Sequence, residues 1–206
     1  MEEYLALIED GQDEIIEKKS RFIGYTASVT TEEEANVFIE SIRKKHYDAR
    51  HNCYAYSIGT GSQPLLRFSD DGEPQGTAGK PILEVIQGSG IRNICIVVTR
   101  YFGGTLLGTG GLVRAYTDAA KAGIAASTVR LKRQLIECEL PMEYTDLGKI
   151  QYLIANTDAE IMDTIYTDKV LLKVRVYAPA YEQFVKAVTE ATGAKVPVEK
   201  TGEVFD

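Results

Sequence analysis

The sequence predicts a two-domain α+β protein, with residues 1–133 and 134–206 as the two domains. Its 206 residues are enough to bury two hydrophobic cores. Arg43 to Arg133 contains thirteen Lys or Arg against six Asp or Glu, whereas Leu135 to Asp206 contains seven against thirteen. The expected order of strands and helices also changes near Gln134. Only the first part is therefore expected to attract a polyanion; the alternative is solvated charge without a partner.

The first domain begins with a strand or hairpin and a capped helix. Residues 13–29 alternate apolar and polar side chains, as one long strand or a pair of strands does. Two overlapping capping boxes at residues 30–34 then predict the start of a helix. Basic residues 43–45 suit the carboxyl end of that helix, because positive charge complements the helix dipole there.

A strand, a loop and a short helix are expected next. Ala49–Gly59 alternates with the period of a strand, and Arg67–Pro81 is too rich in Gly, Pro and Asp to be regular. Loops of this length in compact domains tend to be functional or disordered. Thr77–Gln87 is predicted to be a helix with Pro81 near its first turn.

The stretch from Ile91 to Ala126 is the centre of the first domain. Residues 94–98 are a continuous apolar, mostly β-branched run, which is typical of a strand buried on both faces. Apolar residues then recur at helical spacing from Leu112. Between the strand and this spacing lie the glycines that permit close backbone approach: Gly103, Gly104, Gly108, Gly110 and Gly111.

The second domain is predicted to have the order βαββαβ, which is that of a ferredoxin-like split unit. It contains no Gly-rich loop, no His and no carboxylate pair that stands out, so we expect a docking or dimerising module. The elements are expected near strand 135–142, helix 144–156, strands 160–166 and 170–177, helix 181–192 and strand 195–204.

The glycine loop matches neither of two known phosphate-binding patterns. A Walker loop needs Lys and then Ser or Thr, but Gly111 is followed by Leu112 and Val113. A dinucleotide fingerprint fails because Val113 stands where its third glycine or alanine belongs. A generic anion cradle is left, with Arg100 before it and Arg114 in the first helical turn. The alternative is a purely structural tight turn.

Three carboxylates lie close together in the preceding loop, at Asp70, Asp71 and Glu73. Carboxylates with a bound phosphate are ligands that Mg²⁺ prefers. Adjacent Asp residues in a loop are also common turn formers and helix caps, so a metal site and a structural loop both remain open.

His51 and Cys53 point to the same face of the expected strand. A catalytic thiol would need a lowered pKa, which the sequence cannot show, and no catalytic residue is assigned. The three cysteines are far apart, which argues against disulfides and a zinc ribbon. Alternation of Asn52 and Tyr54 with these residues also resembles a stacking surface for single-stranded nucleic acid.

Three separated motifs together resemble the IMPACT/YigZ family. They are HNCYAY at His51–Tyr56, SDDGEPQGTAGKPIL at Ser69–Leu83 and VTRYFGGTLLGTGGLVRAY at Val98–Tyr116. The last contains the family's signature RYFGGTLLG at Arg100–Gly108. The resemblance covers roughly Asp13 to Ser127 for the domain shared with eukaryotic members. The remainder resembles the bacterial YigZ-type members.

The resemblance implies a fold for each domain. The first would be of the kind seen in a ribosomal small-subunit protein and in the first domain of GHMP kinases. The second would be ferredoxin-like, similar to the C-terminal part of elongation factor G. Eukaryotic members act in translational control by binding the activator of a starvation-sensing kinase, whereas bacterial members have no settled activity.

We therefore expect a translation-associated binding protein that contacts RNA, the ribosome or a translation factor. Lys80, Arg100, Arg114 and the loop glycines would hold phosphate, and His51, Asn52 and Tyr54 would supply neighbouring polar surface. One alternative is an enzyme that acts on a phosphorylated small molecule or nucleotide with Mg²⁺. Another is an adaptor that uses the acidic domain.

The first hypothesis needs no cofactor. The acidic start and the lack of a long apolar run predict a cytoplasmic protein without membrane contact. Homodimerisation through the second domain is a further prediction.

Overall fold

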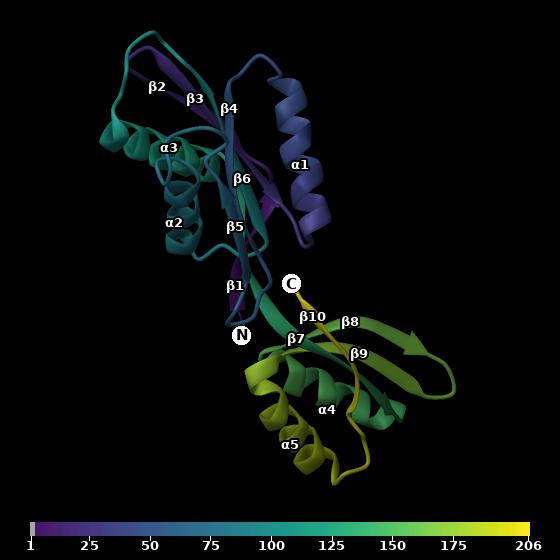
Figure 1. Cartoon of the computed structure of the whole chain (residues 1–206). Helices are drawn as coiled ribbons and strands as arrows, with labels where there is room; N and C mark the ends of the chain where they lie inside the picture. The colour runs from purple at the N-terminus through teal and green to yellow at the C-terminus, as the bar shows by residue number, and fades with distance from the viewer. Residues whose placement is uncertain (1–2) are drawn as a thin grey trace. The chain divides into compact units, whose positions relative to one another are not determined.

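The computed structural model describes residues 3–206, which fold as two compact units, Glu3–Leu131 and Lys132–Asp206. Each unit combines an antiparallel sheet with helices, so the prediction of a two-domain α+β protein is confirmed (Figure 1). No helix between residues 3 and 206 combines the length and apolar character that a membrane crossing requires.

The sheet of the first unit has the strand order β2-β3-β6-β4-β5, and all its neighbours are antiparallel. The central strand β6 is buried along seven of its eight residues. The predicted doubly buried strand is thus confirmed. The bounds are β2 Gln12–Glu17, β3 Ser20–Ser28, β4 His51–Ile58, β5 Leu65–Ser69 and β6 Ile94–Tyr101.

Helices cover both faces of this sheet (Figure 1). On one face, α2 (Gly79–Ser89) and α3 (Thr109–Ala125) pack with Ile94, Ile96 and Val98. On the other face, α1 (Glu32–Lys45) packs with Cys95 and Val97. Both faces of β6 therefore contribute to the core, which explains its continuous apolar sequence.

The hydrogen bonds that cap the start of α1 differ from those of the two predicted capping boxes. Thr31 is the N-cap, and its Oγ1 accepts a hydrogen bond from the Glu34 N–H at 3.2 Å. The Glu34 carboxylate accepts from the Thr30 N–H at 2.6 Å rather than from Thr31. This bond is the first cause of the lowered pKa of Glu34.

Two strands of the first unit were not predicted. β1 (Glu3–Glu9) lies in a stretch for which no element was predicted. The prediction that Arg67 begins an irregular loop is wrong for residues 67–69, which belong to β5 and pair with β4. β5 is a short edge strand with partly exposed side chains, so its alternation is weak.

The second unit has the predicted βαββαβ order, and its strand pairs β10–β7, β7–β9 and β9–β8 are all antiparallel. Its core contains Leu140, Ile150, Leu172 and Phe184. The bounds are β7 Thr128–Met142, α4 Tyr144–Ala155, β8 Ala159–Tyr166, β9 Val170–Tyr177, the short 3-10 helix η1 Ala178–Ala180, α5 Tyr181–Thr192 and β10 Glu199–Phe205. The predicted strand began at residue 135, but β7 begins at Thr128, because residues 128–134 are also in extended conformation.

Candidate functional site

One end of the first sheet gathers the glycine loop, a hairpin turn and the start of α3. The strand registers place Arg21 opposite Tyr101 and His51 opposite Arg100, so β3 and β4 begin where β6 ends. Residues 102–108 leave β6 at this end and lead into α3 (Figure 1). We call the surface formed by residues 18–20, 102–111 and Arg114 the loop end.

The turn between β2 and β3 lies directly against the glycine loop. The Gly103 N–H donates to Ser20 Oγ at 3.1 Å, and a Cβ on Gly103 would lie 2.0 Å from the carbonyl carbon of Lys19. Only glycine allows this approach. Lys18 and Lys19 are exposed on the turn, in left-handed backbone conformations with φ of 44° and 68°.

Lys18 and Lys19 were not among the predicted site residues. Two adjacent basic residues at a predicted hairpin were the available signal, but no sequence pattern indicates that this hairpin lies beside a loop more than eighty residues later in the chain. The hydrogen bond between Ser20 and Gly103 provides the connection.

The start of α3 has unoccupied backbone donors. Its N-cap is Gly108, with φ of 73° and no side-chain cap, and its first turn contains no acidic residue. The first intrahelical hydrogen bond runs from Leu112 N to Gly108 O at 3.0 Å, so the N–H groups of residues 109–111 come before it. Thr109 and Gly110 are exposed. This arrangement suits an anion.

The start of α2, in contrast, is capped by a carboxylate. Asp70 Oδ1 accepts from the Ala78 and Gly79 N–H groups at 3.1 and 2.8 Å, and Oδ2 accepts from the Gly76 N–H at 2.8 Å. Asp70 therefore caps the backbone N–H groups at the start of α2, whereas no side chain caps those at the start of α3.

Arg100 is not placed as an exposed phosphate ligand, which corrects the sequence-based expectation. It is 7% exposed, and its Nη1 lies 2.6 Å from Glu73 Oε1. The Tyr116 hydroxyl donates to the same oxygen at 2.8 Å. The guanidinium carbon lies 5.4 Å from the ring centroid of Phe22 and 5.6 Å from that of Phe102. Through its contact with Phe102, the buried Arg100 side chain therefore packs against the first residue of the glycine loop.

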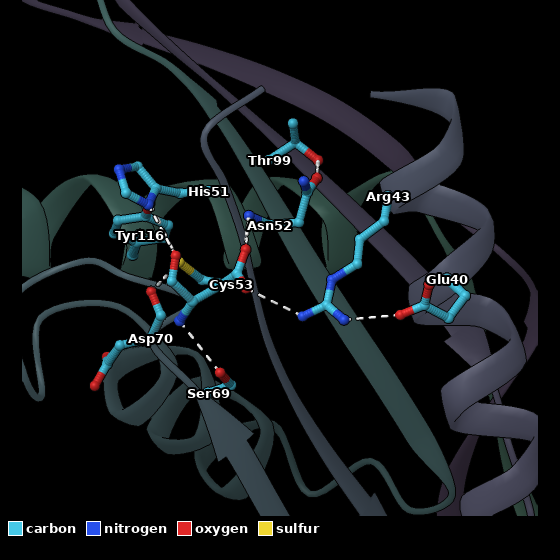
Figure 2. Close-up of polar contacts among 10 residues, drawn as sticks. Glu40, Arg43, His51, Asn52, Cys53, Ser69, Asp70, Thr99 and Tyr116 are labelled. Carbon is cyan, nitrogen blue, oxygen red and sulfur yellow. Dashed lines mark hydrogen bonds and ion pairs between the residues drawn. The ribbon is translucent and has the colours of Figure 1, made fainter. Parts of the chain in front are cut away.

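The polar residues of β4 do not form the shared surface that was predicted. Asn52 is 5% exposed, and its side-chain oxygen accepts from the Thr99 hydroxyl at 2.7 Å (Figure 2). His51 Nδ1 lies 2.8 Å from the Asp71 carbonyl oxygen. Tyr54 stacks on Tyr56 with a centroid distance of 6.3 Å. His51 and the other two residues point to opposite faces of the sheet, because they alternate along one strand.

The three loop carboxylates are all engaged by protein groups. Asp71 Oδ2 accepts from the Asn52 N–H at 2.7 Å, and Asp71 Oδ1 lies 3.1 Å from Arg43 Nη2. Asp70 caps α2 and Glu73 pairs with Arg100. Throughout residues 3–206, no three His, Cys, Asp or Glu side chains are grouped so that they could hold a metal ion. The predicted Mg²⁺ ligands therefore act as structural groups in this fold.

Exposure and burial also distinguish Lys80 from Cys53. Lys80 is exposed on α2, with Nζ 4.0 Å from Glu84 Oε1, whereas its proposed partner Arg100 is buried. Cys53 is buried, and Figure 2 shows it between Asp70 and Tyr116. Burial raises the pKa of the Cys53 thiol far above its ordinary value, so a thiolate nucleophile is not available there. Arg114 is exposed, but α3 begins at Thr109 rather than near Leu112, so Arg114 lies in the second turn of the helix and not in the expected first turn.

The fold and this surface define a two-domain α+β protein with a glycine loop and an uncapped helix at one end of its first sheet. Residues 18–124 match the Impact N-terminal domain, and residues 140–195 match a domain of unknown function named DUF1949. The chain belongs to the IMPACT family, as the sequence motifs predicted.

Two bacterial relatives and one solved structure resemble most of the chain. IMPACT family member YvyE of Bacillus subtilis is 38% identical over 98% of this chain and 92% of the relative. IMPACT family member YigZ of Escherichia coli is 45% identical over 81% of this chain and 82% of the relative. A crystal structure of a protein described as hypothetical is 38% identical, covers 98% of both chains and has a TM-score of 0.63.

Proposed function

We propose that this chain binds RNA of the translation machinery through the loop end. The observation that carries the proposal is the exposed, uncapped start of α3 beside the exposed cations Lys18, Lys19 and Arg114. Helix N–H groups and lysine or arginine side chains are common ligands of backbone phosphates. The arrangement recognises phosphate rather than base sequence, so binding is expected to depend strongly on salt.

The buried groups below the surface give it a fixed shape. The Arg100–Glu73 pair and the stacking of Arg100 on Phe102 hold the first residue of the glycine loop. The Gly103–Ser20 hydrogen bond holds the lysine turn against it. A surface held in this way loses little conformational freedom when it binds a ligand, and this favours high affinity.

Family membership supports the connection with translation. The sequence resemblance implies that eukaryotic members act in translational control, and the matched domain covers residues 18–124 of this chain. RNA is the polyanion of the translation machinery, and the positively charged side chains of the first domain are expected to attract it. The proposal also implies a cytoplasmic location.

Several finer expectations accompany this proposal. The likeness of the first domain to GHMP kinases and a ribosomal protein, and that of the second domain to elongation factor G, stay predictions. Homodimerisation through the second domain is also a prediction. No observation favours the alternative enzyme with Mg²⁺, because the carboxylates it would use bind protein groups.

Fluorescence anisotropy with a labelled single-stranded RNA at low salt tests the proposal. Arg114→Ala is expected to weaken binding by about threefold to tenfold, because it removes one charged contact. Arg130→Ala is the matched control, since Arg130 is an exposed arginine outside the loop end. Absence of binding at low salt, or equal loss in the two variants, would contradict the proposal.

A further inference from the structure

A cavity lies at the opposite end of the first sheet from the loop end. Its volume is about 460 Å³, within the range of small-molecule sites. It is lined by the end of β4, the loop from β4 to β5, the carboxyl end of α2 and residues 90–92. None of its lining residues belongs to the loop end.

The lining combines polar and apolar side chains in a way that suits one small organic molecule. Gln63, Gln87 and Ser62 are exposed and provide amide and hydroxyl groups at the rim. Leu66 and Ile86 provide an apolar wall. The polar groups are too many for a purely apolar ligand, and the cavity is too large for an inorganic ion alone.

Arg92 is the one charged residue that lines this cavity, and its backbone is held on both sides. Gly90 and Asn93 have left-handed conformations with φ of 71° and 55°. The Arg92 N–H donates to the Leu5 carbonyl at 2.8 Å. Asn93 Oδ1 accepts from the Gly59 N–H at 2.7 Å, which ties the loop between β4 and β5 to the same wall.

The Arg92 guanidinium has no carboxylate within ion-pair distance among residues 3–206. By contrast, Arg43, Arg100 and Arg175 each pair with an Asp or Glu. The carboxyl end of α2 favours a cation here, but a helix dipole is equivalent to only about half a charge, so it does not neutralise the arginine. A partly buried arginine without an acidic partner is a ready ligand for an anionic group.

We propose that this cavity binds a small organic anion with a hydroxylated body. Its phosphate or carboxylate would pair with Arg92, and its hydroxyl groups would exchange hydrogen bonds with Gln63 and Gln87. The carbon face of the molecule would lie against Leu66 and Ile86. The site is independent of the RNA-binding surface, since it shares no residue with the loop end.

Isothermal titration of the full chain with three probes of similar body tests this site. Glucose 6-phosphate carries a phosphate, glucuronate carries a carboxylate on the same kind of ring, and glucose carries no charge. We expect at least one of the anions to bind and glucose to bind at least about tenfold more weakly, because it lacks a charge-assisted contact. Whichever anion binds more tightly identifies the head group.

Arg92→Gln is expected to weaken binding of the anion by about tenfold, and Arg130→Gln is the matched control. Circular dichroism establishes that both variants are folded. Gln63→Ala provides a second variant away from the charge, with an expected loss of about twofold to tenfold.

Three results would overturn the proposal: binding of neither anion, equal binding of glucose, or unchanged binding by folded Arg92→Gln. Inorganic phosphate that binds as tightly as glucose 6-phosphate would mean an adventitious ion only. None of these results bears on RNA binding, which is measured with different variants.

Discussion

Arg100 Nη1 and Glu73 Oε1 lie 2.6 Å apart, and both side chains are less than one-tenth exposed. Arg100 is the penultimate residue of β6 and Glu73 belongs to the loop before α2, so the ion pair joins two motifs that are separate in the sequence. Tyr116 of α3 donates to the same carboxylate oxygen. The pair therefore lies where the sheet, the carboxylate loop and α3 meet.

Breaking this pair is expected to destabilise the protein. Glu73→Ala leaves the buried Arg100 without its acceptor and should lower the free energy of unfolding by about 3–5 kcal/mol in urea denaturation. The matched control is Glu84→Ala, which removes the exposed Lys80 pair at 4.0 Å and should cost below about 1 kcal/mol. Equal losses in the two variants would show that the buried pair has no special role.

Gly103→Ala tests the contact between the glycine loop and the lysine turn. The added Cβ would lie 2.0 Å from the Lys19 backbone, so the turn must move, at a cost of about 1–3 kcal/mol. Gly110→Ala is the control, because nothing lies within 4 Å of its added Cβ and alanine suits a helix better than glycine does. Thermal unfolding should show a lower Tm for Gly103→Ala alone; a Tm equal to that of Gly110→Ala would contradict the packing.

His46 predicts a specific pH dependence of stability. Its Nε2 lies 2.6 Å from the Tyr25 hydroxyl and its Nδ1 lies 2.8 Å from the Tyr101 hydroxyl, which donates to Asp48. Since Tyr101 donates its proton to Asp48, it accepts from Nδ1–H, and Nε2 accepts from Tyr25. Burial, assisted by Lys45 and Arg21, lowers the pKa of His46 below its ordinary value of 6.5.

The neutral imidazole therefore suits the folded state better than the charged form does. Because the unfolded chain binds the proton more readily, stability should fall as the pH drops below about 6.5 and through the lower folded pKa. Urea denaturation between pH 7.5 and 5.5 should show a shallower fall for His46→Gln than for the natural chain. Parallel curves would mean that His46 does not contribute to the slope.

The cysteines are expected to be unreactive in the folded protein. Burial raises the pKa of Cys53 and of Cys95, and it raises the pKa of Cys138 to about 11. Ellman's reagent at pH 8 should therefore label the native chain only slowly and label three thiols after denaturation. Rapid labelling of one native thiol would instead support a nucleophile at that position.

Much of the fold could be predicted from the sequence, because the local spacing of apolar residues indicates which side chains are buried. The β-branched run at residues 94–98 and the helical spacing after Leu112 predicted β6 and α3. β5 was missed because an edge strand has a weak alternation. The βαββαβ order of the second unit was readable because turn residues separate α4 from β8, β8 from β9 and α5 from β10.

The candidate site was harder to predict because it depends on contacts between distant residues. The sequence pattern of a strand buried on both faces does not reveal that Arg100 lies beneath α3, or that Glu73 from a separate loop forms an ion pair with it. Three neighbouring carboxylates resemble a metal site, but Asp70 accepts three backbone N–H groups. Lys18 and Lys19 were missed because their place beside Gly103 arises only in the folded chain.

The salt dependence of RNA binding tests the central claim most directly. Anisotropy titrations over a range of salt should compare the full chain with the Lys18→Ala, Lys19→Ala, Arg114→Ala triple variant. Each phosphate contact on a single strand contributes about 0.7 to the slope of log K against log salt, so the triple variant should lose about 2 and bind more weakly. The same affinity and slope in the folded triple variant would show that the loop end is not the RNA-binding surface.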